Sequence, residues 1–211
     1  MKKSMCITYE VEDALYVNVT NKCSNRCTFC IRNNGDSAYG SDSLWLEREP
    51  TVTEIVDSIL SRDVDSYSEI VFCGYGEPSV RLRDARAAAL AVKEKHPTVK
   101  IRINTNGQSD LILGYDTAPF YKDAFDSVSI SLNTPDPKRY VQICRPAFGI
   151  NTHRAIIDFA RRVKAYVPKV AFSVVRETLT EEEITECQKI ADSVGVTLRI
   201  RAYITPDNLS S

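Results

Sequence analysis

Short apolar segments alternate with amphipathic helical patterns along most of this chain, and this alternation constrains its fold more than any other feature. Six segments rich in Val and Ile have the length of buried strands, namely residues 14–20, 69–73, 100–104, 127–133, 170–176 and 196–203. A strand, helix, strand order repeated in this way predicts an α/β fold with a parallel sheet and right-handed crossover connections.

The intervening segments carry helix signals. Thr51 with Glu54, and Thr180 with Glu183, have capping-box spacing at the start of two helices. We expect further helices over residues 82–95, 117–125 and 152–167, and Gly195 is expected to end the helix that follows Thr180. A complete (β/α)8 barrel needs about 250 residues and the chain has 211. The predicted fold is therefore a partial (β/α)6 TIM-like barrel.

The chain is expected to form one domain over residues 1–211. Residues 7–11, a short turn and residues 14–20 resemble a hairpin, so we expect residues 1–13 to add one antiparallel edge strand and residues 14–205 to form the partial barrel. One connection, residues 31–50, is unusually long, and long loops in compact domains are usually functional or disordered.

Composition and charge exclude some classes of function. The formal net charge is −1, which gives no electrostatic reason to expect nucleic-acid binding. No window approaches the ~18 apolar residues of a membrane span, and the first residues lack the apolar stretch of a signal peptide. We therefore expect a cytoplasmic protein, in which the seven cysteines are metal ligands, catalytic groups or core residues rather than disulfides.

Three cysteines follow the first predicted parallel strand at C-x3-C-x2-C spacing: Cys23, Cys27 and Cys30. A [4Fe–4S] cluster normally takes four cysteines, and the next one, Cys73, is far along the chain. The spacing favours a cluster with one iron open to an exogenous ligand, as catalytic zinc sites keep an open position. A structural zinc site needs a nearby fourth ligand, and neither His96 nor His153 has zinc-ribbon spacing. Both histidines are expected at the surface.

Polar groups and glycines follow the next predicted strands, and these strand ends share one edge of a parallel sheet. Glycines permit close backbone approach to a ligand, and a carboxylate suits an ammonium group. The residues concerned are Gly74, Tyr75, Gly76 and Glu77 after the second strand, Asn104, Thr105 and Asn106 at the end of the third, and Ser129, Ser131 and Asn133 on one side of the fourth.

These motifs together make the chain resemble the radical SAM superfamily from its first to its sixth parallel strand. The segment from Gly74 to Pro78 looks like the family's glycine-glycine-glutamate motif, with Tyr75 in place of a common glycine. Residues 16–23, 72–78 and 131–146 look most like the TatD-nuclease-associated radical SAM proteins. The resemblance implies a [4Fe–4S] cluster, S-adenosylmethionine (SAM), and a 5′-deoxyadenosyl radical that abstracts hydrogen from an unidentified substrate, which is oxidoreductase or lyase chemistry.

The resemblance also implies roles for individual residues. Cys23, Cys27 and Cys30 would each ligate one iron, and the SAM amine and carboxylate would chelate the fourth. The remaining assignments are Glu77 with the backbone of Gly74, Tyr75 and Gly76 for the amine, Ser131 and Asn133 for the ribose or carboxylate, Asn104, Thr105 and Asn106 for the same contacts, and Phe29 for the adenine. Arg176 would either pair with the SAM carboxylate or form a surface salt bridge.

The sequence leaves alternatives and partners open. A non-enzymatic iron–sulfur module for electron transfer or sensing would explain the cysteines but not the polar strand ends. An enzyme would need an external one-electron reductant such as flavodoxin or ferredoxin. The substrate could be a small molecule or a macromolecule, and a macromolecule or a second subunit, as in a homodimer, would close the open flank of the barrel. Specificity is expected in residues 31–50, 134–149 and after Tyr203.

The other cysteines have plainer interpretations. Cys187 lies on the apolar face of its predicted helix and is expected in the core. Cys6 and Cys73 are expected as strand residues. Cys144, in the predicted loop 134–149, is either a thiol near the substrate or an ordinary loop cysteine.

Overall fold

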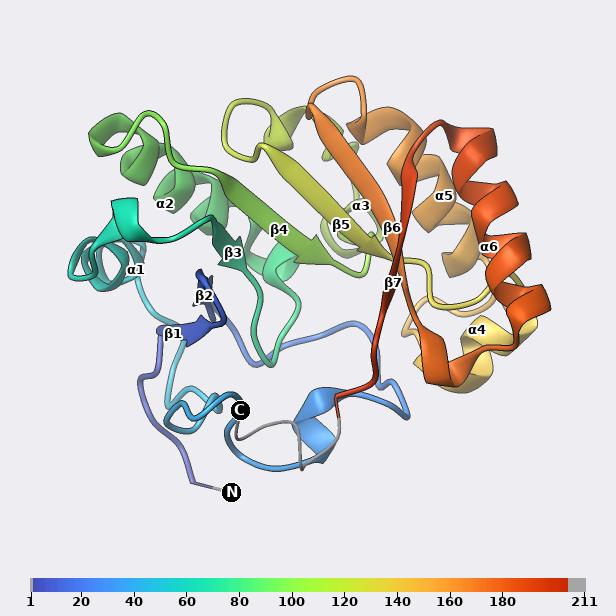
Figure 1. Ribbon diagram of the computed structural model, residues 1–211, viewed down its shortest axis with the longest axis horizontal. Coiled ribbons are helices and arrows are strands. Elements are labelled where there is room, and N and C mark those ends of the chain that lie inside the picture. The colour runs from blue at the N-terminus through green and yellow to red at the C-terminus, as the bar shows by residue number, and fades with distance from the viewer. Residues whose placement is uncertain (1, 205–211) are drawn as a thin grey trace.

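The computed structural model describes residues 2–204 and shows an open, mostly parallel sheet of seven strands (Figure 1). The strands follow one another in chain order across the sheet: β1 (Thr8–Val11), β2 (Ala14–Val17), β3 (Ile70–Phe72), β4 (Ile101–Thr105), β5 (Ser127–Ser131), β6 (Lys169–Val175) and β7 (Thr197–Arg201). Only β1 and β2 pair antiparallel; all later neighbours are parallel. The predicted partial barrel with an antiparallel edge strand is confirmed.

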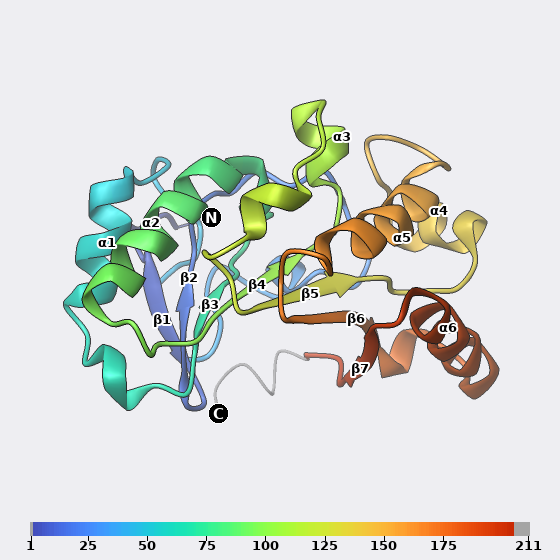
Figure 2. The ribbon, with the colours of Figure 1, turned by 90° about the horizontal axis from the view of Figure 1, so that it is seen from above.

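Six α-helices cover one face of the sheet (Figures 1 and 2). They are α1 (Val52–Leu60), α2 (Leu82–Lys95), α3 (Ser109–Leu113), α4 (Pro137–Cys144), α5 (Thr152–Val163) and α6 (Glu181–Val194). Both predicted capping boxes are present, on Thr51 and Thr180. Gly195 ends α6 with a left-handed φ of 74°, a conformation that glycine adopts without steric cost.

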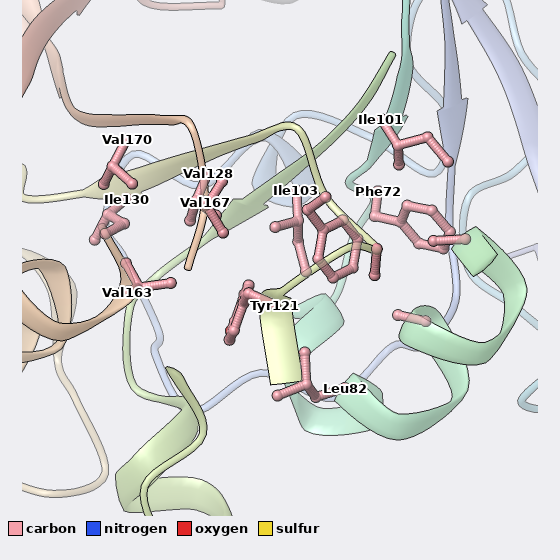
Figure 3. Packing of buried hydrophobic residues seen from close by; sticks show 14 of the residues in the cluster. Phe72, Leu82, Ile101, Ile103, Tyr121, Val128, Ile130, Val163, Val167 and Val170 are labelled. Carbon is pink, nitrogen blue, oxygen red and sulfur yellow. The ribbon is translucent and has the colours of Figure 1, made fainter. Parts of the chain in front are cut away.

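The core lies between the sheet and these helices. Figure 3 shows strand residues such as Phe72, Ile103 and Ile130 directed toward Leu82 of α2 and Val163 of α5. All five are essentially inaccessible to solvent. Because side chains alternate along a strand, the other set of strand residues faces away from the helices, into the hollow of the partial barrel. We call that side the concave face.

Two regions differ from the prediction. The predicted loop 134–149 contains α4, which begins at Pro137. Asp136 caps it, because its carboxylate accepts hydrogen bonds from the backbone N–H groups of Lys138 and Arg139. An Asp-Pro helix start of this kind is a known signal, but eight residues give little periodicity to read. The predicted helix 117–125 is wrong, because only a short 3-10 turn forms at Ala118–Tyr121.

The long loop 31–50 is fastened to the sheet rather than loose. The Asn18 side chain donates to the Leu44 carbonyl at 2.8 Å, and Asn21 both donates to and accepts from the Leu46 backbone, at 2.8 and 2.9 Å. Figure 1 shows this segment crossing the end of the sheet to which the parallel strands point. Within residues 2–204, no helix is long and apolar enough to cross a membrane.

Candidate functional site

Three cysteines lie in the loop that follows β2, at the carboxyl edge of the parallel strands. Cys23, Cys27 and Cys30 are half-buried and carry free thiols. All three belong to one short loop, in which Cys27 adds to the raised pKa of both Cys23 and Cys30. Burial raises the pKa of Cys23 to about 12, with Glu77 adding to the effect, and burial also raises the pKa of Cys30. The Cys27 thiol has its pKa raised by its hydrogen bond to Cys144 and by burial.

The thiols are not gathered as ligands of a single ion. In the part of the chain that the structure describes, no three His, Cys, Asp or Glu side chains are placed to hold one metal ion. A multi-iron cluster takes one thiolate at each of several irons, so its ligands are spread more widely than those of one ion. The thiol-only donor set favours iron–sulfur ligation over a hard cation.

A network of buried polar side chains holds the cysteine loop in place. The Gln108 amide donates to the Asn25 side chain at 2.8 Å and to the Tyr140 hydroxyl at 3.1 Å, and accepts from Ser24 at 2.9 Å. The Asn106 amide donates to Ser24 at 2.8 Å and lies 4.0 Å from the Cys23 sulfur. Such contacts to a ligating sulfur orient it and tune its potential.

Gln108, Tyr140 and Asn25 were missed in the sequence: Asn25 lies within the cysteine motif, but only the cysteines were singled out there, and the other two belong to segments without a recognised motif. All three are buried. Gln108 comes four residues after Asn104, which the sequence did single out, and a buried glutamine directly after a strand end is the signal that could have found it. The network joins the cysteine loop, the segment after β4, and α4.

The segment from Gly74 to Glu77 packs directly against the backbone beside the cysteines. The Glu77 N–H donates to the Lys22 carbonyl at 2.8 Å. A Cβ on Gly76 would lie 2.1 Å from the Thr20 carbonyl oxygen, and one on Gly74 would lie 2.2 Å from the Asn18 amide oxygen. Both glycines therefore permit an approach that any larger residue would prevent.

The Glu77 carboxylate is buried and already engaged by the protein. One oxygen accepts from the Thr105 hydroxyl at 2.6 Å and the Ser79 N–H at 3.0 Å, and the other accepts from the Asn106 N–H at 2.7 Å. Burial raises the pKa of Glu77, and these hydrogen bonds act in the opposite direction. Since an ionised carboxylate has about four lone-pair positions, it can still accept from one further donor.

The side chain of Tyr75 has a structural role, although only the backbone of this residue was expected to contribute to the site. Its side chain is buried, and its hydroxyl donates to the carbonyls of Gly35 at 2.9 Å and Ser37 at 3.1 Å. Its ring packs edge-on against Trp45 with centroids 5.2 Å apart. The tyrosine that replaces a glycine in the motif thus anchors the long loop 31–50 to the end of β3.

The remaining predicted site residues differ in burial and in hydrogen bonding. Phe29 packs partly buried on the core beside Cys27, and Ser131 lies half-buried at the end of β5. Asn133 is buried with a left-handed φ of 63°, and its Oδ1 has no hydrogen-bond partner among the described atoms. Asn104 instead accepts from Arg102 at 3.0 Å.

Arg176 directly follows β6. Its exposed guanidinium pairs with Glu181 at 2.7 Å, so the structure shows the surface salt bridge that the sequence left open as the alternative to a carboxylate contact. Specificity residues expected after Tyr203 fall mainly in 205–211, outside the described residues.

The other cysteines and His153 require corrections. His153 was expected at the surface but is buried, with Nε2 2.8 Å from the Thr134 carbonyl. The reason is that α4, which was not predicted, packs against it through the Tyr140 ring. Cys144 is not a loop residue but the buried last residue of α4, and its sulfur accepts from Asn133 at 3.3 Å. Cys187 is buried in the core, as predicted, whereas Cys6 and Cys73 flank strands.

The residues present fit a cluster with an additional ligand. Three soft thiols share one loop, glycine backbone lies against that loop, and the buried Asn133 oxygen is left without a partner. A buried acceptor without a donor costs free energy, which a bound ligand's N–H or O–H would recover.

Comparison with known proteins agrees with this geometry. The family model of the radical SAM superfamily matches residues 17–190. GTP 3′,8-cyclase of Corynebacterium glutamicum (strain R) is 32% identical over 193 residues, which are 88% of this chain and 47% of that protein. Molybdenum cofactor biosynthesis protein 1 of Drosophila melanogaster is 27% identical over 90% of this chain and 31% of its own length. The chain thus spans about half the length, or less, of these curated relatives.

Solved structures share the fold. A radical SAM methyltransferase from Sphaerobacter thermophilus superposes with a TM-score of 0.60 at 16% identity, over 95% of this chain and 70% of that one. Streptococcus suis SuiB bound to S-adenosylmethionine gives 0.60 at 19% identity, over 90% of this chain and 38% of that one. At these identities the likeness concerns the fold alone.

Proposed function

The chain belongs to the radical SAM superfamily, and we propose that it binds a [4Fe–4S] cluster through Cys23, Cys27 and Cys30 and cleaves SAM reductively. The proposal is supported most by one observation: the cysteine loop and the Gly74–Glu77 segment meet at the carboxyl edge of the sheet. The Glu77 N–H to Lys22 carbonyl bond of 2.8 Å and the close approach of Gly76 to Thr20 hold them together.

The chemistry that the cluster and SAM would supply when bound is the one-electron reductive cleavage of SAM. Its products are methionine and a 5′-deoxyadenosyl radical that removes a hydrogen atom from the substrate. This chain's residues hold the components in place. The backbone around Gly74 and Gly76 and the spare lone pair of Glu77 accept N–H groups of the SAM amine, and the Asn133 Oδ1 accepts from a ligand hydroxyl.

The Asn106 amide beside Cys23 tunes the cluster, and Phe29 provides an apolar surface for the adenine. Loop 31–50, held at this edge by Asn18, Asn21 and Tyr75, would limit the access of water to a reactive intermediate.

Partners and subfamily belong to the same proposal. Family members take electrons from an external reductant, and flavodoxin or ferredoxin in the cytoplasm would fill that role here. The segments at residues 16–23, 72–78 and 131–146 favour the TatD-nuclease-associated branch of the superfamily. The chain spans about half the length of its GTP 3′,8-cyclase relatives. We therefore do not propose GTP as its substrate.

The test is SAM cleavage by anaerobically reconstituted protein with dithionite, followed by chromatography for 5′-deoxyadenosine. We expect the wild-type chain to form 5′-deoxyadenosine. Cys27→Ala should lose both 5′-deoxyadenosine formation and bound iron, and Cys187→Ala, a control in the core, should retain both. Cys144→Ala, which removes a buried thiol next to Cys27, is expected to keep four irons per chain. Product formation by Cys27→Ala, or a zinc-only protein, would contradict the proposal; iron without cleavage would favour an electron-transfer module.

A further inference from the structure

The concave face of the barrel is polar and lined by small side chains. Strand register places paired residues on the same side: Ser127 pairs with Lys169, Ser129 with Ala171, Ser131 with Ser173, Ala171 with Thr197 and Ser173 with Arg199. The interior of a closed (β/α)8 barrel is filled by bulky branched side chains. A cavity of about 790 Å³ opens near the amino ends of β5, β6 and β7, and its lining reaches along this face to Ser129, Ala171 and Arg199 but does not include Arg201.

Three guanidinium groups belong to this face, and they are not equivalent. Arg102 is neutralised, because it donates to both carboxylate oxygens of Glu69 at 2.7 to 3.1 Å. Arg199 and Arg201, two residues apart on β7 and therefore on the same side of the strand, have no carboxylate within ion-pair distance in residues 2–204.

Arg201 is half-buried and has one buried donor without an acceptor, whereas Arg199 is exposed. The Arg201 Nε is buried and has no hydrogen-bond partner among the described residues. Burial lowers the pKa of Arg201, and the neighbouring Arg199 charge acts in the same direction, while Cys73, Tyr16 and Tyr39 lie close enough to oppose it. A buried cationic donor without a partner is costly, and an anion between the two arginines would relieve both the missing bond and the repulsion.

We propose that Arg199 and Arg201 form a binding site for an anionic group, phosphate or carboxylate, on the concave face. Guanidinium groups bind either anion through paired N–H donors, and Ser173, the register partner of Arg199, adds a hydroxyl on the same face.

The site lies inside the barrel toward the carboxyl ends of the strands, because Arg201 ends β7 and is near Cys73, the residue before Gly74. On the proposed function, this anion is part of the substrate whose hydrogen is abstracted, so the substrate is an anionic molecule. Binding of the anion itself does not depend on that function.

The experiment is isothermal titration calorimetry of the full chain with sodium pyrophosphate in one arm and sodium malonate in the other, in a buffer without phosphate. We expect saturable binding of one probe, weakened about tenfold or more in Arg201→Gln and in Arg199→Gln. Arg154→Gln, which removes the same charge from a side chain that is 89% exposed on α5, is the matched control and should bind as the wild type does. Circular dichroism of each variant checks folding, and Arg201→Lys should recover part of the affinity.

Equal affinity in all variants, or no binding of either probe, would overturn the anion site. The same proteins are assayed for 5′-deoxyadenosine. A wild-type chain that cleaves SAM but binds neither probe contradicts this inference alone, whereas a wild-type chain that binds an anion but does not cleave SAM contradicts the proposed function alone. The probe that binds more tightly identifies the anion as phosphate or carboxylate.

Discussion

Gly76 is the residue on which the contact between the two halves of the site depends most. Its Cα lies against the carbonyls of Thr20 and Lys22, so closely that a Cβ would be 2.1 and 2.7 Å from their oxygen atoms. Neither carbonyl belongs to a flexible side chain that could move aside. Glycine is therefore required here by packing, since Gly76 is not among the residues with positive φ.

Gly76→Ala should separate the Glu77 segment from the cysteine loop. We expect the free energy of unfolding to fall by about 1–3 kcal/mol, which is a lower melting temperature by roughly 2–4 °C per kcal/mol for a chain of this size. Bound iron per chain should also fall. Gly35→Ala is the control, because its nearest neighbour would be 3.9 Å from the new Cβ; equal melting temperatures for the two variants would contradict the account.

At this scale the sequence predicted more of the cysteine loop than of its surroundings. Ligand spacing is local, so Cys23, Cys27 and Cys30 were recognisable from ten consecutive residues. The partners of Glu77, by contrast, are Thr105 and Asn106, 28 and 29 residues away, and the Gln108 to Asn25 bond spans 83 residues. Such contacts depend on the assembled sheet, which no local pattern encodes.

Among the elements, the long loop 31–50 is fixed by a few side chains from the ends of neighbouring strands. Asn18 and Asn21 hold its second half, and Tyr75 holds its first half through the Gly35 and Ser37 carbonyls. The Asn34 amide also donates to the Ile204 carbonyl at 2.8 Å. The loop therefore connects the cysteine segment to the chain that follows β7.

Tyr75→Phe removes the hydroxyl while keeping the ring against Trp45. Loss of one buried hydrogen-bonding group should cost about 0.5–1.5 kcal/mol and should increase amide hydrogen exchange in residues 31–50 more than elsewhere. Tyr115→Phe is the matched control, because that hydroxyl accepts a 3.3 Å bond from the exposed Arg83. Unchanged exchange in loop 31–50 would show that Tyr75 does not anchor it.

Element type was predictable where the pattern was long or strongly capped. Both ends of the helix over residues 82–95 were predicted correctly. The capping boxes at Thr51 and Thr180 also marked true helix starts. Strand ends were overestimated, because the apolar pattern of β2 continues to Val19 while pairing stops at Val17. The five residues of α3 are too few for a periodic signal.

The whole molecule is an open barrel whose two faces have different chemistry. The outer face of the sheet packs on helices and supplies the stable core, whereas the concave face presents arginines and small polar side chains. The cysteine loop, the Glu77 segment and loop 31–50 close one end of that hollow. The cysteine loop therefore lies next to the polar concave face, and this arrangement suits hydrogen abstraction from a substrate bound on that face.

The central claim is a [4Fe–4S] cluster held by three thiolates, with SAM at the open iron. Electron paramagnetic resonance of the dithionite-reduced, reconstituted protein tests it most directly, with and without SAM. We expect a spin-½ cluster signal whose g-values shift when SAM is added, and whose intensity is lost in Cys27→Ala. A cluster signal that SAM leaves unchanged, or one that persists without Cys27, would contradict the account.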